Sequence, residues 1–365
     1  MNRIGELVGS SQVIVTCGSG GVGKTTTAAV LAIEAARLGR SAVVVTIDPA
    51  KRLADALGLD GLSNEPAEIS GPWPGKLAAM MLDTERTFDS LVATYAGSPD
   101  QAEKIVSNRF YRNIAGALSG TQEYMASEKL YELHASGDWD LVVVDTPPSR
   151  NALDFLEAPN RLARFLDHRL YRVITAPTRG IVRAVNLAAQ GFLRSVGKVV
   201  GGEVIADAIA FFTAFEGMDE GFRDRAKRVE ALLSDAGTSF VLVASPRADT
   251  VAEASFFAEQ LQRHHISVQA MIVNRMTPDP GPGEPSADRL RAVEFAGTDL
   301  GAHFAVLADV RTLAAGELEQ LAELTERISP APVIRVPMLG VEVHDLESLA
   351  TFGDEVFGRD GSGPR

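Results

Sequence analysis

The sequence lacks features that several classes of protein need. Cys17 is the only cysteine among 365 residues, which excludes a disulfide framework and any zinc or arsenite site built from cysteines within one chain. No apolar run is long enough to span a bilayer, and the N-terminus lacks a signal-peptide pattern, so we expect a cytosolic protein without an integral membrane segment. The net charge of −13 argues against non-specific nucleic-acid binding over the whole surface.

Basic residues are fewer than acidic ones and are unevenly distributed along the chain. The stretch from Arg161 to Lys198 contains a single acid, Asp167. A solvated helical face, or a face paired with acids elsewhere in the fold, is favoured over a dedicated binding surface. The other basic residues of this stretch are Arg164, Arg169, Arg172, Arg179, Arg183 and Arg194.

Runs of β-branched residues alternate with helical segments, which indicates a mostly parallel sheet covered on both faces. The predicted strands are 13–17, 42–46, 77–82, 141–145, 240–244, 268–273 and 333–336. Two stretches, 84–135 and 151–235, have no strand signal and are expected to form an inserted helical subdomain. The ATPase core would then comprise residues 1–83, 136–150 and 236–357, and residues 358–365 would form a disordered tail.

A glycine-rich loop joins the first predicted strand to the first long helix. Its residues, Gly18, Ser19, Gly20, Gly21, Val22, Gly23, Lys24, Thr25 and then Thr26, fit the pattern GxxxxGK[ST]. Glycines let backbone N–H groups turn toward an anion, and the helix adds its positive N-terminal end. Lys24 would reach the β- and γ-phosphates, and the hydroxyl of Thr25 would ligate Mg²⁺.

The same glycines also fit the dinucleotide pattern GxGxxG, with Asp48 as a ribose-binding acid. A dinucleotide turn has no need of Lys24 and Thr25 at the start of the helix, whereas a phosphate cradle needs both. The loop therefore predicts a P-loop NTPase with an α/β fold.

Polar side chains end three of the predicted strands. Asp145 ends an apolar strand in the Walker B arrangement and would hold Mg²⁺ opposite Thr25, through a water. Asp48 could face the γ-phosphate and orient the attacking water. Asn274 could pair with the adenine edge, although its alternative role as a turn or cap residue stays open.

Together these motifs resemble the ArsA-type ATPase family, which includes the arsenite-pump ATPase and the eukaryotic targeting factor for tail-anchored membrane proteins. The family's loop usually reads GKGGVGKTT, its switch I TDPAHNLSDAF and its switch II DTAPTGHTLRFL. The matching segments here are residues 18–26, 47–57 and 145–156. The resemblance implies a Mg²⁺-dependent enzyme that binds and hydrolyses ATP.

The resemblance also implies roles for single residues. It gives Asp48 the water-positioning role and Asn274 the adenine contact. Residues 336–346 are similar to the family's C-terminal signature, which places Pro337 near the base.

Ser19 departs from the family pattern. Family members usually work as dimers in which a lysine from each loop crosses to the partner's phosphates, and Ser19 stands at that lysine's place. The chain resembles an actinobacterial paralogue that lacks this lysine. A homodimer would hydrolyse ATP slowly, or would recruit Lys51, Arg52 or Arg150 instead. We favour a heterodimer with a lysine-bearing paralogue, in which this chain's own site is completed by its partner.

The leading functional prediction is a cytosolic Mg²⁺-ATPase whose nucleotide state opens and closes a dimer and moves the helical subdomain. The resemblance suggests a hydrophobic membrane-protein client, whereas a metalloid cargo would need thiolates. One alternative is a catalytically weak nucleotide-binding scaffold. Another is a partitioning or positioning ATPase acting on DNA or a membrane, which the missing lysine disfavours.

Overall fold

The computed structural model describes residues 3–48, 52–109, 111–112, 121–147 and 217–359, with residues 155, 158, 207, 210, 211, 213 and 214. The chain divides into two compact units. The sheet unit comprises Met1–Met81, Leu133–Leu153 and Ala236–Arg365, and the helical unit comprises Leu82–Glu132 and Asp154–Asp235. The basic stretch 161–198 lies outside the described residues, as do Lys51 and Arg150.

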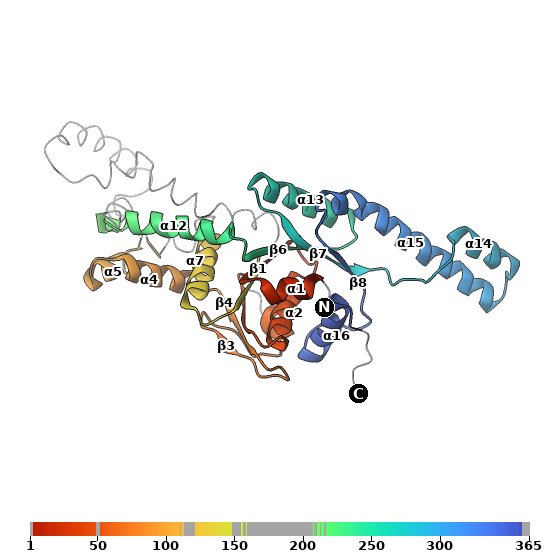
Figure 1. Ribbon diagram of the computed structural model, residues 1–365, viewed down its shortest axis with the longest axis horizontal. Coiled ribbons are helices and arrows are strands. Elements are labelled where there is room, and N and C mark those ends of the chain that lie inside the picture. The colour runs from red at the N-terminus through yellow and green to blue at the C-terminus, as the bar shows by residue number, and fades with distance from the viewer. Residues whose placement is uncertain are drawn as a thin grey trace. The chain divides into compact units, whose positions relative to one another are not determined.

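In its described part, the sheet unit is built on an eight-stranded sheet (Figure 1). The strand order is β3-β4-β2-β5-β1-β6-β7-β8, and every neighbouring pair is parallel except β3 with β4. The prediction of an α/β fold with a mostly parallel sheet is confirmed. The strands are β1 Val13–Gly18, β2 Ser41–Thr46, β3 Ala67–Glu68, β4 Lys76–Met81, β5 Leu141–Asp145, β6 Thr238–Ala244, β7 Val268–Met276 and β8 Val333–Pro337.

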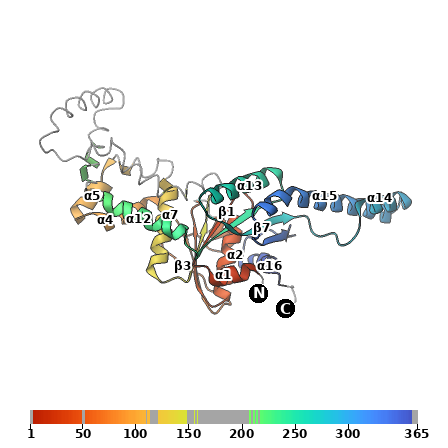
Figure 2. The same ribbon diagram turned by 45° about the horizontal axis from the view of Figure 1, so that its top comes forward.

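Helices cover the sheet because its central strands are apolar on both faces; β1 and β5 are buried along their whole length. Alternate residues such as Ile14, Val44 and Val143 share one core with residues from α1, α2 and α16. Helix α13 lies on the opposite face of the sheet (Figures 1 and 2). The helices of this unit are α1 Arg3–Ser10, α2 Lys24–Arg37, α3 Arg52–Ala56, α13 Ala248–Arg263, α14 Pro285–Glu294, α15 Asp299–Arg327 and α16 Leu346–Phe357.

Helix α2, which begins at Lys24 directly after the glycine-rich loop, is packed against the sheet. Small residues such as Ala28, Ala32 and Ala35 are fully buried, so its backbone lies close to the sheet. The helix is capped by Leu38, and Gly39 follows in the left-handed region with φ 83°, where its N–H donates to the carbonyl of Ala36. Gly39 therefore ends the helix as a left-handed C′ residue.

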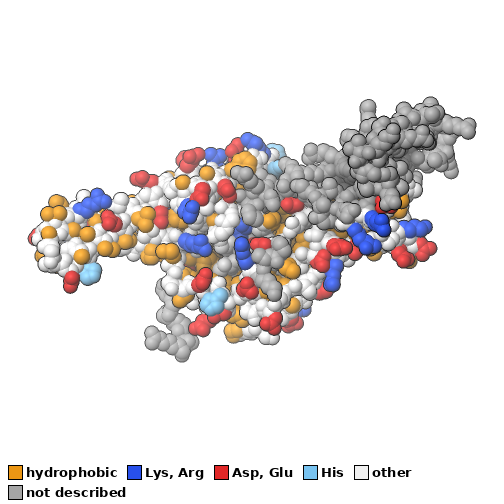
Figure 3. All heavy atoms as spheres, turned by 180° about the vertical axis from the view of Figure 1, so that it is seen from behind, with side chains coloured by type: hydrophobic (Ala, Val, Ile, Leu, Met, Phe, Trp, Pro, Cys, Tyr) orange, Lys and Arg blue, Asp and Glu red, His pale blue; other side chains and the backbone are white. Residues whose placement is uncertain are grey.

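Helices α14 and α15 form a hairpin that the sequence pattern did not predict. Its base is fixed by Arg311, whose Nε donates to Asp288 Oδ2 at 2.6 Å in a buried ion pair, and whose guanidinium also binds the carbonyls of Gly281 and Pro282. Apolar side chains gather on the hairpin surface (Figure 3). The large exposed ones are Leu290, Val293, Phe295, Leu300, Val306, Leu313 and Leu318.

The helical unit contains α4 Thr84–Tyr95, α5 Pro99–Val106 and α12 Asp219–Leu233, and most of α7, Thr121–Ser136. A buried polar cluster joins α7 to α12: Glu128 accepts from the Tyr124 hydroxyl at 2.5 Å and from Arg225 Nε at 2.6 Å. Burial raises the pKa of Glu128, which these two donors oppose. Removing Arg225 would leave the buried carboxylate of Glu128 without a counter-charge.

The described part of the chain ends at Arg359. Gly358 caps α16 in the left-handed region, and Arg359 forms ion pairs with Glu34 and Asp354. The described part of the chain contains no helix with the length and hydropathy of a membrane span.

Candidate functional site

The loop between β1 and α2 holds two glycines that no other residue could replace without movement. A Cβ on Gly18 would lie 2.0 Å from the carbonyl oxygen of Val243 on the neighbouring strand. Gly23 caps α2 with φ 100°, and a Cβ there would lie 2.5 Å from Asn274 Nδ2. The loop can therefore present its backbone N–H groups at the start of α2 only with glycine at these places.

Lys24 and Ser19 contact each other within the loop. Both residues are buried, and Lys24 Nζ donates to the backbone carbonyl of Ser19 at 2.8 Å. Burial lowers the pKa of Lys24, and the charges of Asp145 and Asp48 partly oppose this. An anion seated in the loop would give this buried ammonium a partner of opposite charge.

Asp145 ends β5 beside two threonine hydroxyls. Its Oδ2 accepts from Thr25 Oγ1 at 2.8 Å and from Thr46 Oγ1 at 3.0 Å. The carboxylate is buried, and this burial raises its pKa to about 6. Its other oxygen, Oδ1, is buried and has no hydrogen-bond partner among the described residues.

This donor set fits Mg²⁺. The ion prefers hard oxygen ligands and is usually held by one or two protein groups together with substrate phosphates. The Thr25 hydroxyl and the unpartnered Asp145 Oδ1 are such groups. No cluster of three or more His, Cys, Asp or Glu side chains that could hold a metal by itself is found in the described ranges.

Asp48 follows β2, the strand next to β5 in the sheet. Its backbone N–H donates to Thr46 Oγ1 at 3.2 Å, and its carboxylate lies 3.6 Å from Arg52 Nη1. The Asp48 side chain is 28% exposed, so solvent reaches it. The sheet thus brings Asp48 and Asp145 to the same edge, where Thr25 also lies.

Asn274 contacts the phosphate loop through its side-chain amide. Nδ2 donates to the carbonyl of Val22 at 3.0 Å, and Oδ1 accepts from the backbone N–H of Arg275 at 2.8 Å. Arg275 has φ 61°, which is rare for a residue with a long side chain. Asn274 therefore links the end of β7 to the loop, in addition to any contact with a base.

A cavity of about 460 Å³ opens beside Asn274 at the start of α2. Pro337 ends β8 opposite Met276 and is not among the lining residues. Residues 338–343, which follow Pro337, line the cavity. The part of the C-terminal signature that borders the cavity is therefore the loop after β8. The lining consists of Gly23, Thr26, Asn274, Arg275, Met338, Leu339, Gly340, Val341, Glu342, Val343 and Phe352.

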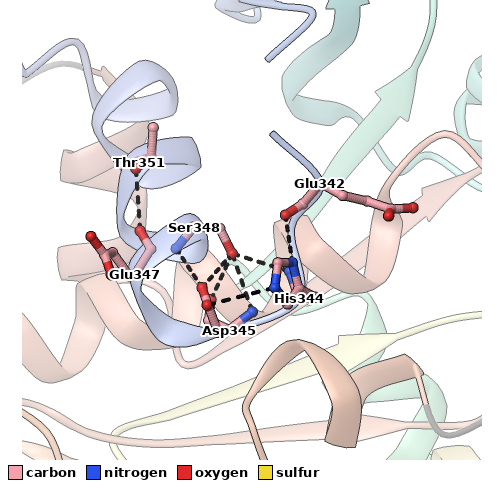
Figure 4. A network of polar contacts seen from close by, with 6 residues as sticks. All are labelled: Glu342, His344, Asp345, Glu347, Ser348 and Thr351. Carbon is pink, nitrogen blue, oxygen red and sulfur yellow. Dashed lines mark hydrogen bonds and ion pairs between the residues drawn. The ribbon is translucent and has the colours of Figure 1, made fainter. Parts of the chain in front are cut away.

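The lining loop is anchored by a capping box at the start of α16 (Figure 4). Asp345 Oδ1 accepts from Ser348 N at 2.8 Å, and Ser348 Oγ contacts the backbone N–H groups of His344 and Asp345. His344 Nδ1 lies 2.8 Å from the carbonyl of Glu342. These contacts hold one wall of the cavity against α16.

Cys17 lies at the end of β1, immediately before the loop. It is buried, and burial raises the pKa of its thiol well above the usual range. The thiol therefore stays protonated at neutral pH and is a poor metal ligand or nucleophile.

Sequence reasoning did not identify Thr46. Thr46 could have been found from its position, because it lies two residues before Asp48 at the end of β2, and β2 pairs with β5 so that Thr46 lies beside Asp145. The predicted switch residues 49–51 and 148–154 lie outside the described residues.

The chain is similar to known proteins over most of its length. The family model described as anion-transporting ATPase matches residues 11–292. Relatives named ATPase GET3 include one from Paracoccidioides lutzii, 25% identical over 349 residues, and one from Aspergillus niger, 26% identical over 339 residues. Each match spans 92% of this chain and 87% of the relative.

Proposed function

The chain belongs to the anion-transporting ATPase family, and from this premise we propose that it hydrolyses MgATP at the loop between β1 and α2. The observation that carries the proposal is the buried carboxylate of Asp145. One of its oxygens accepts hydrogen bonds from Thr25 and Thr46, and the other has no hydrogen-bond partner among the described residues. A buried polar atom of this kind points to a ligand that completes it.

Each residue of the site would have a separate role in binding or hydrolysing MgATP. Lys24 would move from the Ser19 carbonyl to the β- and γ-phosphates, and the start of α2 would add its N–H groups. Thr25 and Asp145 would hold Mg²⁺, which when bound would offset the charge on the phosphates. Asp48 would orient the attacking water. The base would lie in the cavity beside Asn274.

We further propose that the protein works in the cytosol as a dimer whose nucleotide state moves the helical unit. A hydrophobic membrane-protein segment is the proposed client. The partner is a lysine-bearing paralogue, since Ser19 cannot supply a charge to another subunit's phosphates. Recovery of such a paralogue with the protein purified from its native host, in an ATP-dependent manner, would support this pairing; recovery of the chain only with itself would contradict it.

Ser19→Lys tests the role of the missing lysine. If two copies of this chain can pair, the variant is expected to hydrolyse ATP at least ten times faster than the wild type, because a cation supplied by a partner offsets transition-state charge. Ser19 is only 6% exposed, so the new side chain must leave the loop to act. Steady-state phosphate release measures the effect, with Ser19→Met as a control of similar length without charge.

Equal, slow turnover in all three proteins, with tight ATP binding, would instead support the nucleotide-binding scaffold. Fast turnover of the wild type alone, unaffected by either change, would remove the need for a partner.

Gly23→Ala is expected to weaken ATP binding more than tenfold. A Cβ at φ 100° strains the backbone by about 1–3 kcal/mol and would also push Asn274 away from the loop. Gly39→Ala is the matched control, since Gly39 has φ 83° at the other end of α2 and open space around it. Titration calorimetry with ATP should show near-normal affinity for the control, and equal losses in both variants would contradict the Asn274 contact.

A further inference from the structure

The side chain of Thr46 contacts both acids of the proposed site. Its Oγ1 donates to Asp145 Oδ2 at 3.0 Å and accepts from the backbone N–H of Asp48 at 3.2 Å. A hydroxyl has one proton and two lone pairs, so both bonds can form at once, and together they fix its rotor. The hydroxyl of Thr46 therefore links the carboxylate of Asp145 on β5 to the backbone of Asp48, which follows β2.

The sheet holds Thr46 in this position. Strands β2 and β5 pair in parallel with Thr46 beside Asp145, and Ile47 N donates to the carbonyl of Asp145 at 3.2 Å. Thr46 is 2% exposed, and β-branching restricts its side-chain rotation. The strand pairing alone would not require a hydroxyl here, because Val43, Val44 and Val45 occupy the same strand without one.

We propose that Thr46 is a positioning residue that couples the metal-anchoring carboxylate to Asp48. This inference rests on the proposed function. Thr25 and Thr46 both bind Asp145 Oδ2, so Oδ1 is the oxygen left for the metal or its water. Because the same hydroxyl accepts from Asp48 N–H, a shift of the carboxylate on metal loading is transmitted to the residue proposed to orient water.

Thr46→Val tests the coupling, because valine keeps the shape of threonine and suits a strand. It removes one of the two donors to Asp145 Oδ2 and the acceptor of Asp48 N–H. Loss of a hydrogen bond to a charged group predicts a fall in kcat of about 10- to 100-fold. The Kd for ATP measured in EDTA should change less than threefold, whereas the gain in affinity on adding Mg²⁺ should be lost.

Two variants complete the experiment. Thr46→Ser keeps the hydroxyl and should restore kcat and the Mg²⁺-dependent gain to within about threefold of the wild type. Thr27→Val is the matched control: Thr27 is fully buried in α2, and its hydroxyl has no hydrogen-bond partner among the described residues. It should match the wild type, and thermal unfolding verifies that every variant is folded.

The two proposals fail differently. Normal kcat and a normal Mg²⁺-dependent gain in Thr46→Val, or a Thr46→Ser variant as impaired as Thr46→Val, would overturn the coupling. A wild type that binds ATP more tightly with Mg²⁺ but never releases phosphate would overturn the proposed hydrolysis alone. In that case, loss of the Mg²⁺-dependent gain in Thr46→Val and its return in Thr46→Ser would still support the coupling.

Discussion

Asp145→Asn is expected to stabilise the nucleotide-free protein while reducing Mg²⁺-dependent ATP hydrolysis at least about 100-fold. Burial raises the pKa of Asp145 from 3.8 to about 6, so its charge opposes folding at neutral pH by up to about 3 kcal/mol. Asparagine removes that charge and keeps the shape. It also removes the anionic oxygen proposed to hold the metal.

The stabilisation should depend on pH in a defined direction. The folded pKa lies above the unfolded one, so protonation of Asp145 contributes stability that is complete below pH 3.8 and lost as pH rises through about 6. The difference in unfolding free energy between variant and wild type should therefore be about 1–3 kcal/mol at pH 8 and shrink toward pH 5.

Urea unfolding at several pH values measures this difference. Asp138→Asn, an exposed acid of the same unit, should show a difference near zero throughout. An Asp145→Asn protein that is less stable than the wild type at pH 8 would contradict a net cost of burying this charge.

Asp48→Asn is expected to lower kcat about 10²- to 10⁴-fold with ATP affinity within threefold of the wild type. An amide has nearly the same shape as a carboxylate but lacks the negative charge that makes a carboxylate a strong acceptor for orienting the attacking water. The ion pair with Arg52 is also lost, but it lies at an exposed position and contributes little stability. Asp60→Asn, an exposed acid outside the switch I segment 47–57, is the matched control and should behave as the wild type.

Single-turnover phosphate release and ATP titration separate the two effects. Equal loss of affinity and turnover in Asp48→Asn would indicate that Asp48 shapes the binding site rather than acts on water.

The sequence predicted the sheet well because its strands are buried on both faces. Continuous runs such as Val142-Val143-Val144 are hard to place anywhere else. The two-residue strand β3 has no such run, since it lies at the sheet edge and contains only Ala67 and Glu68. The α14–α15 hairpin was missed because many of its large apolar residues are exposed, so they do not produce the one-sided pattern of a helix packed on a core.

The site residues could be predicted where they belong to one short sequence motif. The loop from Gly18 to Thr25 carries its glycines, lysine and threonine in one short segment. Thr46 was not predictable in the same way, because its importance depends on the side-by-side pairing of β2 with β5. The place of Pro337 near the base stays a prediction; the cavity beside Asn274 is lined by the loop that follows Pro337 and precedes α16.

Phosphate release from MgATP by the purified wild type, measured beside Asp48→Asn with ATP affinity determined on the same samples, tests the central claim most directly. We predict that both proteins bind ATP alike, and that the wild type releases phosphate, slowly when alone, while Asp48→Asn releases at least about 100-fold less. A wild type that does not bind ATP, or equal phosphate release by the two proteins, would contradict it.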